Sequence, residues 1–295
     1  MMIRRYGYLF ASGLIGALMS PGAPALAAAG CPDGTQAIAD EIVMAWQHRE
    51  AMSAPAIADG DHAICVQNAV VAGLVDDGQQ PSGWKVGLTS AAAQENFGVD
   101  HPLAGRLLPG SILEDGATVS RGFGGRPVVE ADLIVTVADP AIMEATTPLE
   151  VLAHLDSFVP FIELPDLMVA AGEPMSADVI TAINVGARTG VAGPEISLSA
   201  TEETVDALGA MTVRIEDAGK VVAEIPGAAI LGNPLNAMLW LTGELAARGL
   251  SLQAGDRISL GSFGPPMQPV DLERLTVTYI GLPFDTDPAV TVAFE

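Results

Sequence analysis

Three carboxylates lie in apolar stretches of the sequence, where acidic side chains are out of place. Glu130 and Asp132 stand two positions apart within residues 128–137, and Glu163 ends an apolar run over residues 158–162. Residues at positions i and i+2 of a strand point to one face of a sheet, so the first two carboxylates project together. Carboxylates buried side by side repel one another unless a cation neutralises them. Their chemistry predicts a Mg²⁺ or Mn²⁺ site rather than a Zn²⁺ site, and harmless acids on an exposed strand face are the alternative interpretation.

The elements that must position these carboxylates can be predicted from the pattern of residues. Apolar residues at helical spacing predict helices over residues 33–51 and 61–74, and a T-x-x-E motif at Thr147 begins another. A further helix opens at Asn233 and stops at Gly249. β-Branched and apolar runs predict strands over residues 84–88, 128–137, 159–164, 211–215, 221–225, 257–260, 275–280 and 290–294. Helices followed by many strands predict a mixed α+β body rather than a doubly wound sheet.

The composition limits the classes of function. The 295 residues are 49% hydrophobic and 17% charged, which is typical of a globular protein. The net charge of −23 would repel nucleic acid phosphates, so we expect no nucleic-acid partner. The glycine-rich residues 122–125 lack the Lys-Ser/Thr ending of a phosphate-binding loop, and we interpret them as a mobile connection before the strand that carries Glu130.

The first residues have the features of an export signal. Arg4 and Arg5 precede a short apolar stretch over residues 8–19, and an A-x-A cleavage signal lies at residues 25–27. We therefore predict a signal peptide over residues 1–27 and a periplasmic or secreted protein with no stable membrane insertion after cleavage. A twin-arginine leader, a lipobox that ends at Cys31 and a buried first helix fit the pattern less well.

Export changes the interpretation of the two cysteines. Cys31 and Cys65 are the only cysteines of the chain, and both lie in the part predicted to be helical. In an oxidising compartment they could form a disulfide, and closing a loop of this length would stabilise the fold by roughly 3–4 kcal/mol. Two separate thiols are the alternative, and the sequence alone leaves both interpretations open.

Five short blocks of sequence occur in order along the chain. They are GWKVGLTS at residues 83–90, VEAD at 129–132, PFIE at 160–163, LGNPLNA at 231–237 with WL at 240–241, and GSFGP at 261–265. Together they resemble the conserved blocks of the 2-keto-4-pentenoate hydratase family, within the fumarylacetoacetate hydrolase superfamily. The resemblance implies a helical N-terminal segment over residues 31–80 on a rolled, mixed β-sheet catalytic domain over residues 81–295, assembled into homo-oligomers.

The resemblance also implies a reaction and the residues that perform it. The three carboxylates would hold the cation, which chelates a small 2-keto acid, and water would add to a 2-hydroxydienoate through a metal-stabilised enolate. Lys85 would be the catalytic cation, and Thr89 and Ser262 would contact the substrate. A related 2-keto acid decarboxylase, an acylpyruvate-type hydrolase and an exported binding homologue without turnover are the alternatives.

Several positions depart from the family pattern. Leu103 stands where the family has an acid, and Val128 and Met168 stand where it has arginines. Asn233 replaces a histidine, and Asp132 is one methylene shorter than the usual glutamate. The predicted metal scaffold and Lys85 are kept while polar partners are lost, so the identity of the substrate stays open.

Overall fold

The computed structural model describes residues 30–75, 79–197 and 199–295. The predicted signal peptide, residues 1–27, lies outside the described residues. Residues Cys31–Glu295 form one compact unit. None of the helices in the described residues is long and apolar enough to span a membrane.

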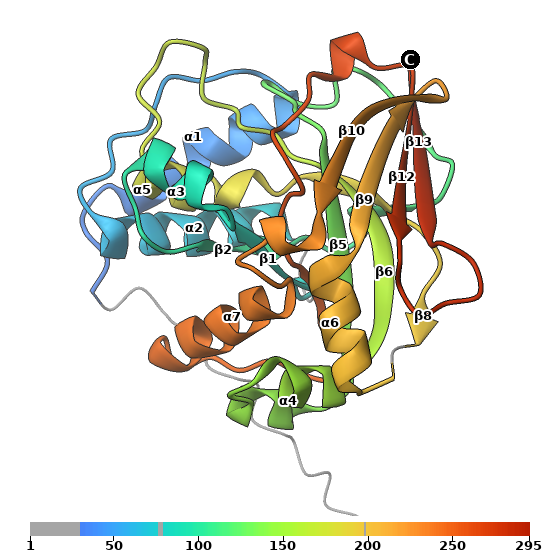
Figure 1. The fold of residues 1–295 in the computed structure, drawn as a ribbon. Coiled ribbons are helices and arrows are strands. Elements are labelled where there is room, and N and C mark those ends of the chain that lie inside the picture. Colours follow the sequence, from blue (N-terminus) through green and yellow to red (C-terminus); the bar gives the residue numbers. More distant parts are fainter. Residues whose placement is uncertain (1–29, 76–78, 198) are drawn as a thin grey trace, which may run out of the picture. The chain divides into compact units, whose positions relative to one another are not determined.

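Two β-sheets form the centre of this unit (Figure 1). The larger sheet has the order β2 (Leu103–Leu107), β1 (Gly83–Gly87), β11 (Arg257–Ser259), β5 (Glu130–Val137), β6 (Leu155–Leu164), β7 (Thr189–Ala192) and β3 (Ile112–Glu114), with β8 (Ile196–Ser197) beside β6. The smaller sheet has the order β10 (Lys220–Pro226), β9 (Thr212–Asp217), β12 (Arg274–Ile280), β13 (Ala289–Phe294) and β4 (Thr118–Val119). Parallel and antiparallel pairs occur in both sheets, which confirms the predicted mixed α+β fold.

The helices lie in two groups around the sheets. The first group is α1 (Thr35–His48), α2 (Gly60–Leu74), α3 (Ala91–Phe97) and α5 (Ala177–Ala182), which lie together in Figure 1. The second group is α4 (Pro148–Ala153), α6 (Glu202–Ala210) and α7 (Leu235–Ala247). The described residues also contain four short 3₁₀ turns: η1 (Pro140–Glu144), η2 (Asn184–Gly186), η3 (Gly227–Ala229) and η4 (Pro269–Asp271).

Local sequence signals explain where the predicted helices begin and end. The Thr147 hydroxyl accepts a hydrogen bond from the Glu150 amide while the Glu150 side chain accepts one from the Thr147 amide, which is the predicted capping box. The first helix is shorter than predicted, because Arg49 adopts a left-handed φ of 58° and ends it. A disulfide joins Cys31 to Cys65 and ties the start of this region to α2.

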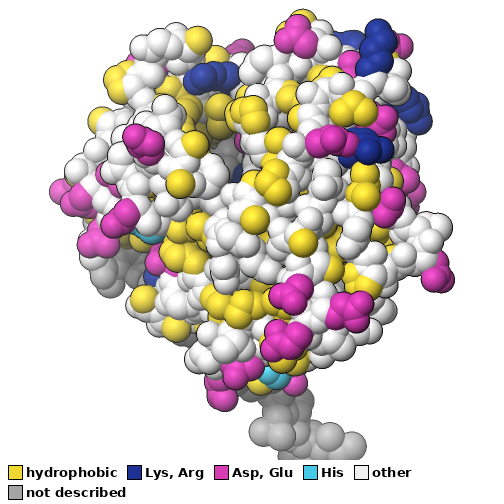
Figure 2. Space-filling view, viewed as in Figure 1, with side chains coloured by type: hydrophobic (Ala, Val, Ile, Leu, Met, Phe, Trp, Pro, Cys, Tyr) yellow, Lys and Arg dark blue, Asp and Glu magenta, His cyan; other side chains and the backbone are white. Residues whose placement is uncertain are grey.

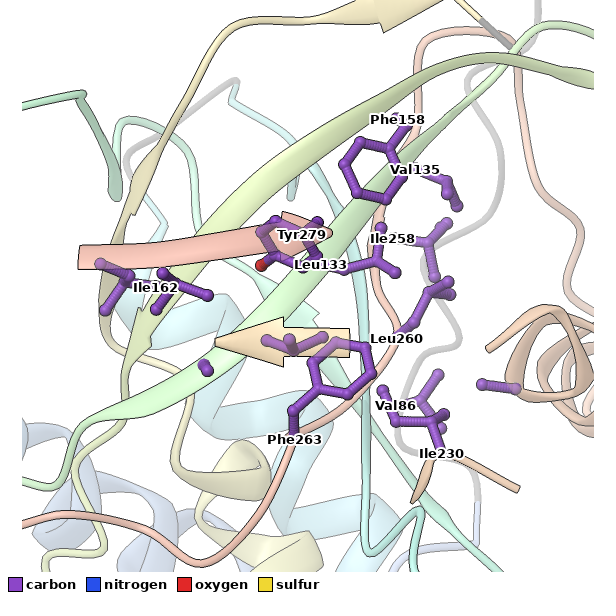
Figure 3. Packing of buried hydrophobic residues seen from close by; sticks show 14 of the residues in the cluster. Val86, Leu133, Val135, Phe158, Ile162, Ile230, Ile258, Leu260, Phe263 and Tyr279 are labelled. Carbon is purple, nitrogen blue, oxygen red and sulfur yellow. The ribbon is translucent and has the colours of Figure 1, made fainter. Parts of the chain in front are cut away.

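Tyr279 connects the two sheets. Its ring packs edge-on against Phe158, with ring centroids 5.2 Å apart, and against Phe263 at 6.2 Å (Figure 3). The buried Tyr279 hydroxyl donates a hydrogen bond to the carbonyl of Asp132 and accepts one from the Phe161 amide. A side chain of the smaller sheet thus fixes β5 and β6 at the level of the predicted metal ligands.

The glycine-rich segment before β5 differs from its predicted mobility. The amides of Gly125 and Arg126 donate to the two Asp166 carboxylate oxygens at 2.9 and 2.8 Å, and Arg188 pairs with the same carboxylate at 3.1 Å. A Cβ at Gly124 would lie 2.4 Å from the Asp166 carboxylate carbon. The prediction of a mobile connection was therefore wrong: the backbone of residues 124–126 closes on the buried Asp166 carboxylate, and Gly124 leaves room for that carboxylate.

Candidate metal and keto-acid site

Adjacent strands of the larger sheet bring the predicted site residues together. Glu130 on β5 lies directly opposite Glu163 on β6, and Asp132 follows two positions along β5 on the same face. Lys85 lies on β1, which is separated from β5 by the short strand β11. Residues that are up to 78 positions apart in the sequence therefore meet at one region of the sheet.

Lys85 and Glu163 form a buried ion pair. The Lys85 Nζ lies 2.5 Å from the Glu163 Oε1, and the two side chains are 4% and 3% exposed. Burial lowers the pKa of Lys85, but the negative charges of Glu163, Glu130 and Asp132 and the hydrogen bond to Glu163 outweigh it, so the pKa is raised above its ordinary value. Lys85 is therefore fully protonated at neutral pH.

Asp132 is held by groups of the neighbouring chain segments. The Ser259 hydroxyl donates to the Asp132 Oδ2 at 2.6 Å, and the amides of Gly261 and Leu133 donate to the Oδ1 at 3.1 and 2.5 Å. Burial and the charge of Glu163 nevertheless raise the pKa of Asp132 well above its usual range. Both carboxylate oxygens of Asp132, the acid that is one methylene shorter than the usual glutamate, thus have hydrogen-bond partners.

The charges of the site do not balance. Burial, together with the charge of Glu163, raises the pKa of Glu130 to about 7, although Lys85 partly opposes the shift. Three carboxylates face a single ammonium group, so their full ionisation would leave two uncompensated negative charges in a buried region. Hard oxygen donors with this charge fit a divalent cation.

The carboxylates of the described residues do not converge on one metal position. Across residues 30–75, 79–197 and 199–295, no three His, Cys, Asp or Glu side chains converge closely enough to hold a metal ion. Glu130 and Glu163 line the adjacent cavity, whereas Asp132 points toward Ser259 and is fully buried. The donors fit a cation by charge and chemistry, and the assignment of all three as ligands stays a prediction.

A cavity opens beside these carboxylates. Its lining consists of Lys85, Val86, Gly87, Leu88, Thr89, Ser90, Ala93, Phe97, Glu130, Glu163, Pro165, Leu167, Ile180, Val185, Gly261, Ser262, Gly264 and Pro266. Lys85, Thr89 and Ser262, predicted from the sequence to act on the substrate, all reach it. Gly261 has a φ of 115°, and a Cβ there would lie within 3 Å of the Thr89 side chain, so this residue must be glycine for the two loops to meet.

Two contributors to the site were missed at the sequence level. Ser259 occurs in the predicted strand over residues 257–260, where nothing local distinguishes it from any other strand serine. Val185 has a left-handed φ of 52°, which is rare for a β-branched residue, and its side chain lines the cavity. The preceding Asn184 fixes this backbone, because its side chain exchanges two hydrogen bonds with the backbone of Arg106.

Comparison with known proteins gives the family. The chain is 30% identical over 230 residues to 2-keto-4-pentenoate hydratase 1 of Dechloromonas aromatica (strain RCB), a match that covers 77% of this chain and 84% of that protein. This chain belongs to the 2-keto-4-pentenoate hydratase family. It is also 30% identical over 207 residues to a 4-oxalocrotonate decarboxylase of Pseudomonas putida, covering 70% of this chain and 76% of that enzyme. No protein-family model matches the sequence.

Solved structures agree with this membership of the hydratase family. The 4-oxalocrotonate decarboxylase from Pseudomonas putida G7, complexed with magnesium and adipate, superposes with a TM-score of 0.76 at 25% identity, over 88% of this chain and 97% of that chain. A structure of the same enzyme with calcium and acetate superposes with a TM-score of 0.75. The fold is therefore of the fumarylacetoacetate hydrolase type, and solved relatives hold divalent cations.

The positions that depart from the hydratase family pattern have structural roles in this chain. Leu103 is buried and packs with Ile180 and Val185 behind the cavity wall. Val128 and Met168 are buried. Asn233 holds the start of α7, because its side chain accepts from the Leu235 amide and donates to the Val205 carbonyl. Polar positions of the family pattern are thus occupied by packing or capping residues.

Proposed function

We propose that this chain is a metal-dependent hydro-lyase that adds water to a 2-hydroxydienoate, the enol form of an unsaturated 2-keto acid. The observation that carries the proposal is the buried group of Glu130, Asp132, Glu163 and Lys85 beside a cavity, with an excess of two negative charges when all four are ionised. Named relatives include hydratases and a decarboxylase, and the solved relative holds magnesium.

The described residues have distinct roles in this proposal. A bound Mg²⁺ or Mn²⁺ would supply Lewis-acid stabilisation of the enolate. The Lys85 ammonium, already at the cavity surface, is placed to pair with the carboxylate of the keto acid. Glu130, whose pKa burial and Glu163 raise to about 7 in the metal-free protein, is a carboxylate whose ionised form a bound cation would stabilise. Thr89 and Ser262 border the same space and offer hydroxyls to substrate oxygens.

A 2-keto acid decarboxylase is the second candidate, because a relative named 4-oxalocrotonate decarboxylase is also 30% identical to this chain. Both reactions pass through the same kind of enolate, so the metal site alone does not separate them. The acylpyruvate-type hydrolase and the binding homologue without turnover stay predictions of the sequence.

The first experiment is calorimetric titration of metal-stripped protein with Mg²⁺ and Mn²⁺, with and without pyruvate. We expect cation binding that tightens when pyruvate is present, because the keto acid completes the ligand shell. Glu130→Gln should weaken cation binding while the circular dichroism spectrum is retained. No cation binding in the wild-type protein, or unchanged affinity in the variant, would contradict the proposal. Incubation with a 2-hydroxydienoate, with carbon dioxide release measured in parallel, then separates hydration from decarboxylation.

We also propose that the protein is exported and that it assembles into a homo-oligomer. The leader pattern at residues 1–27 and the disulfide between Cys31 and Cys65 support export, since disulfides persist in oxidising compartments. The Cys31 sulfur is engaged in this bond, so it is not free for the thioether of a lipoprotein. Mass spectrometry of mature protein from the periplasm tests the cleavage after Ala27, and light scattering tests the assembly. A cytoplasmic, uncleaved product would contradict export.

A further inference from the structure

We propose that a second pocket of the protein binds a phosphate-type oxyanion through Arg49 and Arg188. This pocket has a volume of about 420 Å³ and lies between the end of α1 and the segments that flank β3 and β4. None of its described lining residues also lines the keto-acid cavity. The inference therefore stands independently of the proposed function.

The charge of this second pocket differs from the charge of the whole chain. The chain has 36 acidic residues and only 13 lysines and arginines, which gives the net charge of −23. Among the described residues, however, the pocket is lined by two arginines and by no aspartate or glutamate. A chain with such an excess of acids repels anions in general, so the two guanidinium groups form a local exception.

The guanidinium group of Arg188 is held in place through one of its nitrogens. The Arg188 Nη1 donates to the Trp46 carbonyl at 2.9 Å and to the Asp166 carboxylate at 3.1 Å. The guanidinium also stacks on the Trp46 ring, 4.4 Å from the ring centroid. Its Nη2 and Nε donate to no described residue. A guanidinium group that is fixed in this way is preorganised to donate further hydrogen bonds to an oxyanion.

Arg49 adds a second positive charge that acts on Arg188. Burial lowers the pKa of Arg188, Asp166 opposes this effect, and the charge of Arg49 lowers the pKa further. Arg49 is exposed and forms no ion pair with a described residue. An anion bound to both guanidinium groups would remove their repulsion and would gain charge-assisted hydrogen bonds, which are stronger than neutral ones.

Two hydroxyl groups add to the donors of the second pocket. Thr118 and Ser120 line it and are exposed, and neither hydroxyl donates to a described residue. The hydroxyls of Ser111 and Thr189, in contrast, already donate to backbone carbonyls at 2.7 and 2.6 Å. Several free donors match a phosphate group, which presents three or more acceptor oxygens, better than a carboxylate with two.

The remaining lining of the second pocket is largely apolar. Leu108, Leu113 and Phe123 border the space that a phosphate ion alone would leave open. These side chains offer dispersion contact to an organic group attached to the phosphate. The same donors therefore suit free phosphate and a phosphate monoester, and binding measurements distinguish the two.

Calorimetric titration of the purified protein with inorganic phosphate and with phenyl phosphate, in buffer without divalent cations, tests the second pocket. We expect saturable binding at one site per chain. Tighter binding of phenyl phosphate would identify a monoester as the ligand, and equal or weaker binding would identify the free ion; both results uphold the site. Pyruvate should not displace the phosphate, since the two cavities share no described lining residue. Absence of saturable binding, or displacement by pyruvate, would overturn the inference.

A pair of arginine substitutions locates the bound phosphate. Arg49→Gln removes the exposed cation of the second pocket and should weaken phosphate binding by about tenfold, the loss expected for one charge-assisted hydrogen bond. Arg214→Gln removes the same charge from a partly exposed position of β9 outside the pocket, so it is the matched control and should leave the affinity unchanged. Circular dichroism verifies that both variants fold. Wild-type affinity in Arg49→Gln, or an equal loss in both variants, would overturn the inference.

Discussion

The Lys85 ammonium and the Glu163 carboxylate form a nearly completely buried ion pair at 2.5 Å, on strands β1 and β6 of the same sheet. Lys85 is one of only two lysines in a chain with a net charge of −23. Lys85 lies beside three buried acids, so its ammonium group is part of the site and not of the protein surface. Acidic side chains, in contrast, are spread over the face of the molecule that Figure 2 shows.

Removal of the Lys85 charge should destabilise the metal-free protein. Lys85→Met leaves Glu163 buried without its cation, so the free energy of unfolding should fall by about 3–5 kcal/mol. Added Mn²⁺ should restore part of the loss by neutralising the same carboxylates. Urea denaturation of both forms measures the effect, and Lys220→Met, at the exposed second lysine, is the control. Equal stability of Lys85→Met and Lys220→Met would show that the ion pair has no energetic role.

The stability of the metal-free protein should decrease as the pH rises toward neutrality. Burial and the charge of Glu163 raise the pKa of Glu130 in the folded protein to about 7, from an ordinary value of 4.5. Between these two values the folded state binds more protons than the unfolded state, so stability falls as pH rises through that window. Thermal unfolding at about pH 5 and pH 8 measures the change.

The variant Glu130→Gln measures how much Glu130 contributes to the pH dependence of stability. The decrease in stability with pH should be smaller in Glu130→Gln than in the wild-type protein, since the amide does not titrate. Glu203→Gln, at an exposed position of α6, provides the matched control and should behave as the wild-type protein. The same pH slope in all three proteins would contradict a raised Glu130 pKa.

Two glycine-to-alanine substitutions should have opposite effects. Gly87→Ala would push a Cβ to 2.5 Å from the Val185 Cγ1, so it should destabilise the protein by about 1–3 kcal/mol and weaken keto-acid binding. Gly243→Ala lies in α7 with no atom within 4 Å of the new Cβ, and it should stabilise the helix by about 0.5–1 kcal/mol. Denaturation curves measure both. A stabilising Gly87→Ala would show that the cavity wall is not held by this close approach.

The disulfide should stabilise the region of α1 and α2. Its half-cystines are separated by 34 positions, and closing such a loop corresponds to about 4 kcal/mol in the chain-entropy description. The double variant Cys31→Ser/Cys65→Ser should therefore unfold at a lower temperature. Reductant should lower the unfolding temperature of the wild-type protein to that of the variant and leave the variant unchanged. If reductant also lowered the unfolding temperature of the variant, its effect on the wild-type protein could not be assigned to the disulfide.

The sequence alone determined the elements with strong periodic or capping signals. The capping box at Thr147, the strand that carries Glu130 and Asp132, and the family blocks were all recognisable because each signal lies within a few consecutive residues. The short strands β2, β3, β4, β7 and β8 were not predicted, since their two to five residues lie outside the apolar and β-branched runs from which strands were predicted. Their pairing with long neighbours makes them strands.

The tertiary structure decided which groups share the site and how they are charged. The order of strands brings Lys85 to Glu163 and Ser259 to Asp132, pairs whose separation in the sequence carries no signal of contact. The pKa of Glu130 likewise depends on burial and on Glu163, neither of which a linear pattern contains. Residue types thus fixed what chemistry was available, whereas chain packing fixed the electrostatic environment in which that chemistry takes place.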